Sequence, residues 1–182
     1  MTPRSLAERI SALHAALAGL PHAFGGAVAL AYYAEPRATI DIDLNVFVPV
    51  DRYDEVAEPL ASLGVPTGGP HVRELVARDG QVRVFWDATP IDLFFAYDAF
   101  HTAAAGARRS VPFADGEIPI LAREHLMVCK VVFDRPKDWV DIDAMLAVDE
   151  PLDAAEVLRW VGRIAGDTDR RYVRIVALLT RR

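Results

Sequence analysis

Apolar residues recur every three or four positions at the start of the chain, at Leu6, Ile10, Leu13 and Leu17. This spacing places side chains on one face of an α-helix. Thr2 followed by Pro3 is a typical N-cap with proline at the first helical position. Gly19 and Pro21 end the pattern, so the sequence predicts a first helix before residue 19.

Strand-forming patterns occupy residues 22–24 and, more clearly, residues 39–48. Between them, residues 27–34 are predicted to form a compact helix that ends before Pro36, because a residue that precedes proline is disfavoured in the helical region. Successive side chains of a strand point to opposite faces of a sheet. Asp41 and Asp43 are therefore predicted to face the same side.

The rest of the chain alternates between the two periodicities and then becomes helical. Residues 73–78 and 81–86 are predicted to form a hairpin around Asp79-Gly80. Further strands are predicted over 91–95, 110–113 and 118–121. Helices are predicted over 51–63, 98–106, 124–133, 137–148 and 153–165, with a last helix capped by Asp167 or Thr168. This order indicates an α+β fold, with a small mixed sheet flanked by helices in residues 1–120 and a helical C-terminal lobe in 121–182. We expect the two parts to form a single compact unit.

Composition narrows the class of protein. The chain has 182 residues, of which 52% are hydrophobic, and this is enough for a substantial core. Cys129 is the only cysteine, which excludes an intramolecular disulfide. The charged N-terminus does not resemble a signal peptide, and no apolar run approaches the length of a membrane span. The chain is therefore expected to be soluble and cytoplasmic.

Charge gives a weaker indication. The formal net charge of −6 argues against a broad surface that coats nucleic acid. A local basic patch is still compatible with it, and the last residues supply a candidate in Arg170, Arg171, Arg174, Arg181 and Arg182.

Three carboxylates, Asp41, Asp43 and Asp92, lie on extended segments among apolar residues. Burying an unpaired carboxylate costs several kcal/mol, so three converging acids call for cations. Two divalent ions about 3.5–4 Å apart, with triphosphate oxygens as further ligands, would meet this need. The alternative is structural: the Asp-x-Asp pair caps a turn, and Asp92 pairs with an arginine.

Gly25-Gly26 follows the first predicted strand and precedes a helix. Glycine allows the backbone to approach a ligand closely and to direct N–H groups at phosphate. An ordinary strand-to-helix turn is the alternative. Arg37 either binds phosphate or pairs with Asp43 or Glu35.

Together, Gly25-Gly26, the run Arg37-x-Thr39-x-Asp41-x-Asp43 and Asp92 on a later strand resemble the DNA polymerase β-like nucleotidyltransferase superfamily. The segments 124–130 and 134–141 are similar to the Lys helix and the Arg/Lys-x-Asp-x-x-Asp segment of a narrower branch. That branch holds the AbiEii-type and MenT-type toxins of type IV toxin–antitoxin systems. The resemblance covers roughly residues 20–147 and implies the nucleotidyltransferase fold.

The resemblance also implies roles for individual residues. Asp41, Asp43 and Asp92 would bind two Mg²⁺ ions, with Mn²⁺ as the alternative, and Asp92 would also accept the proton of the acceptor hydroxyl. Lys130 would neutralise the triphosphate or the leaving pyrophosphate, and Asp141 would be the late acid of the catalytic set. The residues expected to bind the nucleotide are Gly25, Gly26, Arg37, Thr39 and Lys130.

Three points of this assignment remain open in the sequence. Asp138 is the alternative for the late acid. Lys130 stands four residues before Asp134, a helical spacing that would also suit a structural ion pair. The sequence has Gly26 where many superfamily members have serine, so a hydroxyl contact to phosphate is missing and backbone donors must replace it.

The implied activity is transfer of a nucleoside monophosphate from an NTP to an acceptor hydroxyl, with pyrophosphate leaving. The resemblance favours an RNA end, such as the tRNA 3′ terminus, as the acceptor, with the protein acting as a toxin beside a cognate antitoxin. One alternative is adenylylation of an aminoglycoside-like small molecule or of a protein. Another is a module that binds a nucleotide or a partner without catalysis.

Overall fold

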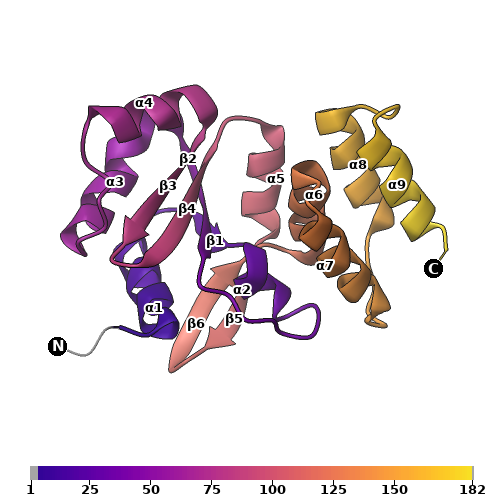
Figure 1. The fold of residues 1–182 in the computed structure, drawn as a ribbon, viewed down its shortest axis with the longest axis horizontal. Helices are drawn as coiled ribbons and strands as arrows, with labels where there is room; N and C mark the ends of the chain where they lie inside the picture. The colour runs from indigo at the N-terminus through magenta and orange to yellow at the C-terminus, as the bar shows by residue number, and fades with distance from the viewer. Residues whose placement is uncertain (1–3, 182) are drawn as a thin grey trace. The chain divides into compact units, whose positions relative to one another are not determined.

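The computed structural model describes residues 4–181, which form two compact units (Figure 1). The sheet unit contains the described residues up to Val28 together with Ala38–Leu121. The helical unit contains Ala29–Arg37 and the described residues from Ala122 onwards. A short segment from the N-terminal part of the chain therefore belongs with the C-terminal helices.

All strands of the described chain lie in the sheet unit: β1 (His22–Phe24), β2 (Ile42–Pro49), β3 (Gln81–Trp86), β4 (Thr89–Ala96), β5 (Arg109–Phe113) and β6 (Gly116–Ile120). They form a mixed sheet in the order β3-β4-β2-β1-β6-β5. β2 pairs parallel with β4 and antiparallel with β1, and β3 pairs antiparallel with β4. Buried apolar side chains of β2 and β4 alternate with less buried ones, and the buried set supplies much of the core: Ile42, Leu44, Val46, Ile91, Leu93 and Phe95.

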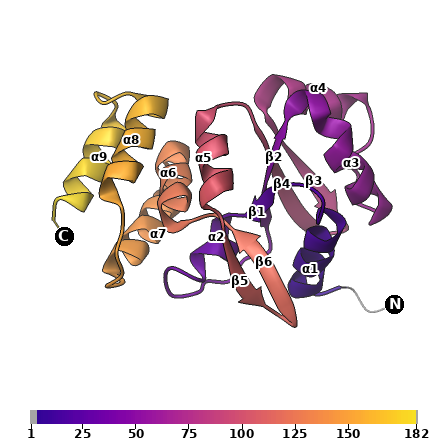
Figure 2. The same ribbon diagram turned by 180° about the vertical axis from the view of Figure 1, so that it is seen from behind.

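The helices that begin in the sheet unit are α1 (Leu6–Ala16), α2 (Gly26–Leu30), the 3₁₀ helix η1 (Val50–Arg52), α3 (Tyr53–Ser62), α4 (Pro70–Asp79) and α5 (Ala99–Ala107). The helical unit contains α6 (Arg123–Phe133), α7 (Pro136–Ala147), α8 (Ala154–Ala165) and α9 (Arg170–Leu179). α6 packs against the other three (Figure 2). Buried Trp139, Val157, Trp160 and Ile175 form part of their common core.

The predicted hairpin around Asp79-Gly80 is wrong. Residues 70–79 form α4, with Pro70 at its first turn, and Gly80 ends the helix with a left-handed φ of 66°. Gly80 therefore caps a helix, a role that glycine fills without steric cost. The hairpin instead joins β3 to β4 through a turn at residues 87–88, in which Asp87 has φ 53°.

Several predicted boundaries also differ. Ser5 caps α1 in a capping box with Glu8, and the predicted cap at Thr2 and Pro3 lies outside the described residues. β2 begins at Ile42 and not at residue 39. Asp169 caps α9, in place of the predicted Asp167 or Thr168.

The remaining predicted strands and helices are present with small shifts of their ends, α2 being the most shortened. Within residues 4–181, no helix combines the length and the apolar character that crossing a membrane requires.

Candidate active site

The sheet unit places the three predicted acids together at one end of β2 and β4. Asp43 and Asp92 are register partners on these parallel strands, so their side chains lie on the same side of the sheet. Asp41 stands two residues before Asp43, just ahead of β2. Asp41, Asp43 and Asp92 are called the acid cluster below.

Arg83 on β3 joins this cluster, and the sequence did not predict it. It is the register partner of Asp92, and its Nε and Nη2 donate to the two carboxylate oxygens of Asp92 at 2.7 and 2.6 Å. The same guanidinium lies 3.7 Å from Oδ2 of Asp41. Hydrogen bonding to Asp92 raises the pKa of Arg83 further, and the charges of Asp41 and Asp43 act in the same direction.

The position of the hairpin explains why Arg83 was missed. A turn at residues 79–80 would pair Arg83 with the segment before it, whereas the turn at 87–88 pairs it with β4. The structural alternative for Asp92, a pair with an arginine, is confirmed as a contact.

The double glycine of the sheet unit fits closely around Asp43. The Gly25 N–H donates to the carbonyl oxygen of Asp43 at 2.9 Å. Gly26 has φ 51°, and a Cβ atom at this position would lie 1.7 Å from Oδ2 of Asp43. A Cβ atom at Gly25 would meet Nδ2 of Asn45 at 2.9 Å. The two glycines therefore leave room for the carboxylate of Asp43 and for the amide beside it.

Thr39 forms a local turn ahead of β2. Its Oγ1 accepts a hydrogen bond from the N–H of Asp41 at 3.2 Å and donates to the carbonyl oxygen of Asp41 at 3.3 Å. Such side-chain bonds to a nearby backbone compete with the strand ladder, which accounts for the later start of β2. Thr39 thus supports the backbone that carries Asp41.

The acid cluster suits a hard divalent cation in its chemistry, because carboxylate oxygens are ligands that Mg²⁺ prefers. Among the described residues, however, no group of three or more Asp, Glu, His or Cys side chains is arranged so that it could hold a metal ion. A cationic group already lies in the cluster, since Arg83 contacts both Asp92 and Asp41. The acids suit a cation by their donor chemistry, but in this arrangement Arg83 holds Asp92, and a metal ion that used Asp92 would have to displace it.

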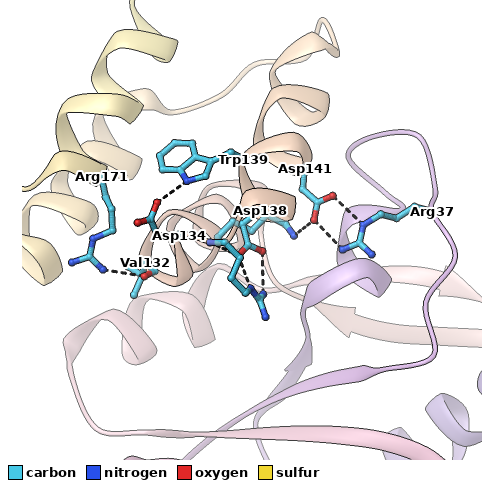
Figure 3. A network of polar contacts seen from close by, with 9 residues as sticks. Arg37, Val132, Asp134, Asp138, Trp139, Asp141 and Arg171 are labelled. Atoms are coloured by element: carbon cyan, nitrogen blue, oxygen red, sulfur yellow. Dashed lines mark hydrogen bonds and ion pairs between the residues drawn. The ribbon is translucent and has the colours of Figure 1, made fainter.

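A second polar group lies within the helical unit. Nζ of Lys130 donates to Oδ2 of Asp141 at 2.6 Å, and Arg37 donates to both oxygens of Asp141 at 3.0 Å (Figure 3). The side chains of Lys130 and Asp141 are only 5% and 4% exposed. Burial alone would raise the pKa of Asp141, but the hydrogen bonds from Arg37 and Lys130 outweigh burial and lower it.

These contacts give the partners of three side chains whose pairing the sequence left open. The carboxylate that Arg37 holds is Asp141, which was not among its predicted partners. Lys130 pairs with Asp141 and not with Asp134, so the predicted spacing of four residues identified the wrong acid. Asp138 forms a pair of bonds with Arg135 at 2.7 and 3.0 Å. Of the two acids proposed for the late position, Asp141 is the one that contacts Lys130.

Three of the five arginines of the predicted C-terminal basic patch have partners within the helical unit, and Arg182 lies outside the described residues. Arg170 pairs with Asp134. The other carboxylate oxygen of Asp134 accepts a bond from Nε1 of Trp139 at 2.7 Å (Figure 3). Arg171 pairs with Asp169 at 2.9 Å. The guanidinium of Arg174 lies 3.9 Å from the centroid of the Trp139 ring, a cation–π contact.

No protein-family model and no curated protein matches the sequence. Solved structures do resemble it. One is a crystal structure of ANT(2'')-Ia in complex with adenylyl-2''-tobramycin, at 19% identity, a TM-score of 0.55 and coverage of 96% of this chain and 97% of that one. Another is a solution structure of the antibiotic-resistance factor ANT(2'')-Ia, at 19% identity, a TM-score of 0.50 and coverage of 95% and 92%.

At this level of identity the similarity concerns the fold. The chain has a nucleotidyltransferase fold, with a mixed sheet and a helical C-terminal region. The narrower likeness to AbiEii-type and MenT-type toxins gains no support from these structures.

Proposed function

We propose that this protein transfers a nucleoside monophosphate from an NTP to a hydroxyl group of a small, aminoglycoside-like molecule, with a divalent metal ion as cofactor. The observation that carries the proposal is the acid cluster: register pairs Asp43 with Asp92, and Arg83 bridges Asp92 and Asp41. The cluster stands in a chain whose fold is that of nucleotidyltransferases.

Two observations favour a small acceptor over the RNA end that the family resemblance suggested. ANT(2'')-Ia, whose structure resembles 96% of this chain, was crystallised with an adenylylated small molecule, adenylyl-2''-tobramycin. Three of the five arginines expected to guide an RNA backbone, Arg170, Arg171 and Arg174, are engaged instead within the helical unit. No finding supports the toxin role or the antitoxin, and both remain predictions.

In the proposed reaction, the acid cluster would bind the metal ion and accept the proton of the acceptor hydroxyl. The acceptor oxygen forms a bond to the α-phosphorus as the bond to pyrophosphate breaks, and the hydroxyl proton passes to a carboxylate, for which Asp92 is proposed. Asp41, Asp43 and Asp92 would hold Mg²⁺. When bound, such ions neutralise charge on the triphosphate and favour ionisation of the attacking hydroxyl.

The backbone around Gly25 and Gly26 would fix Asp43 in place, because the N–H of Gly25 donates to the carbonyl oxygen of Asp43 and Gly26 lies against its carboxylate. In the helical unit, Lys130 holds Asp141.

The proposal is tested by incubating the protein with each α-³²P-labelled NTP, Mg²⁺, and either tobramycin or total tRNA. We expect label on tobramycin, and we expect Asp43→Asn to lower the rate by about 100-fold or more, the scale for loss of one electrostatic contact in a transition state. Asp115→Asn, an exposed acid in the β5–β6 turn, is the matched control. Label on tRNA alone would restore the RNA acceptor, and no label on any acceptor would contradict transfer itself.

A further inference from the structure

Arg83 supplies the positive charge that faces two members of the acid cluster, Asp92 and Asp41. Its two bonds to Asp92 use both carboxylate oxygens, and its third contact reaches Asp41. A carboxylate whose two oxygens already accept from a guanidinium has less electron density to offer a metal ion. As long as this pair persists, Asp92 is a poor metal ligand and a poor base.

The pair is also suited to being opened. The Arg83 side chain is 48% exposed and that of Asp92 is 20% exposed, so water competes for the guanidinium and weakens the pair. β3 lies at the edge of the sheet, so the side chain has solvent beside it. The register holds Arg83 opposite Asp92 and yet leaves the long side chain able to turn away.

We propose that Arg83 is a built-in competitor of the divalent metal ion, which keeps the acid cluster neutralised until metal displaces it from Asp92. The proposal rests on the proposed function only in taking the acid cluster as the metal site. Arg83 would therefore set the metal concentration at which the cluster becomes loaded. It would also prevent three like charges from repelling one another before loading.

The test measures Mn²⁺ binding by the whole protein without nucleotide or acceptor, from the EPR signal of free Mn²⁺. Arg83→Gln removes the competing charge and should bind Mn²⁺ about three- to fivefold more tightly, the factor that corresponds to an exposed charge pair. Arg83→Lys keeps the charge but cannot bond both carboxylate oxygens in the same way, so its affinity for Mn²⁺ should lie between that of the wild type and that of Arg83→Gln. Arg78→Gln, at an exposed arginine on α4 that pairs with Asp79, should match the wild type.

Circular dichroism of each variant checks that the fold is intact. Equal or weaker Mn²⁺ binding by a folded Arg83→Gln variant would overturn the proposal, and so would a lack of binding by every variant. Because the titration needs no acceptor, it separates this proposal from the proposed function. Tighter metal binding by Arg83→Gln, together with no transfer to any acceptor, would leave the competitor role standing and remove the activity.

Discussion

The carboxylate of Asp43 occupies the space beside Gly26 that the side chain of any other residue would need. A Cβ atom there would lie 1.7 Å from Oδ2 and 2.5 Å from Cγ of Asp43. The serine that many superfamily members carry at this point could not be accommodated here without moving Asp43. In this chain, therefore, Gly26 and Asp43 are matched to each other.

Gly26→Ala should consequently displace Asp43 and destabilise the fold. A non-glycine residue at this φ of 51° costs roughly 1–3 kcal/mol, and the clash adds to it. We expect a lower melting temperature and loss of nucleotidyl transfer. The control is Gly106→Ala in α5, where a Cβ atom meets nothing within 4 Å. It should raise stability slightly. An unchanged melting temperature for Gly26→Ala would contradict the geometry.

Asp141 offers a test in the helical unit. Asp141→Asn leaves Lys130 buried without its anionic partner, which should cost about 3–5 kcal/mol of the free energy of unfolding. Asp143→Asn, at an exposed position on the same helix, should change it by less than about 0.5 kcal/mol. Both values come from urea unfolding at neutral pH.

The same residue predicts a pH dependence. The folded protein lowers the pKa of Asp141, so its contribution is fully present above the unfolded value of about 3.9. That contribution is lost as the pH falls through the folded-state pKa. Stability of the wild type should therefore fall more steeply below about pH 4 than that of Asp141→Asn. Parallel curves would show that the pair contributes no pH-dependent stability.

At the scale of elements, α9 is joined to α6 by polar contacts as well as by its apolar face. Nη1 of Arg171 donates to the carbonyl oxygen of Val132 at 3.0 Å, in the last turn of α6 (Figure 3). Carbonyl groups at a helix C-terminus lack partners within the helix. Arg171, on a neighbouring helix, thus supplies a hydrogen-bond donor for one of these carbonyl groups.

Arg171→Ala should lower the free energy of unfolding by about 1 kcal/mol, the typical value of such a hydrogen bond. Arg181→Ala, at an exposed position beyond α9, should leave stability unchanged. If the acceptor is a small molecule, both variants should keep kcat/KM for transfer to tobramycin. A selective loss of labelling of tRNA by Arg181→Ala would instead support an RNA contact by the C-terminal arginines.

At the scale of the whole molecule, the formal net charge of −6 and the acid cluster predict that stability depends on metal and nucleotide together. A ligand at 100 times its Kd stabilises the folded state by about 2.7 kcal/mol. Mg²⁺ with the preferred NTP should raise the melting temperature, whereas EDTA or Asp43→Asn should abolish the rise. A rise without any transfer would favour the non-catalytic binding module, and the size of the rise with each NTP would identify the preferred base.

Periodicity alone predicted most elements of this protein, because a buried helix face and a strand both leave a repeat in the sequence. It failed at residues 73–78, where Asp79-Gly80 has the composition of a hairpin turn but serves as the end of α4. Helix ends and hairpin turns both use a left-handed glycine, so composition could not separate them. Tertiary packing of residues 70–79 as a helix decided between these two conformations.

Alternation of side chains along extended backbone follows from local geometry, so the sequence alone predicted that Asp41 and Asp43 would lie close together, although only Asp43 belongs to β2. The sequence could not determine which strands are neighbours. Only the tertiary structure placed Asp92 beside Asp43, Arg83 beside Asp92, and Arg37 with Lys130 on Asp141. Those pairings join residues up to 104 positions apart. They depend on strand order and helix packing, which are set by the burial of apolar surface from the whole chain and leave no local pattern at the residues concerned.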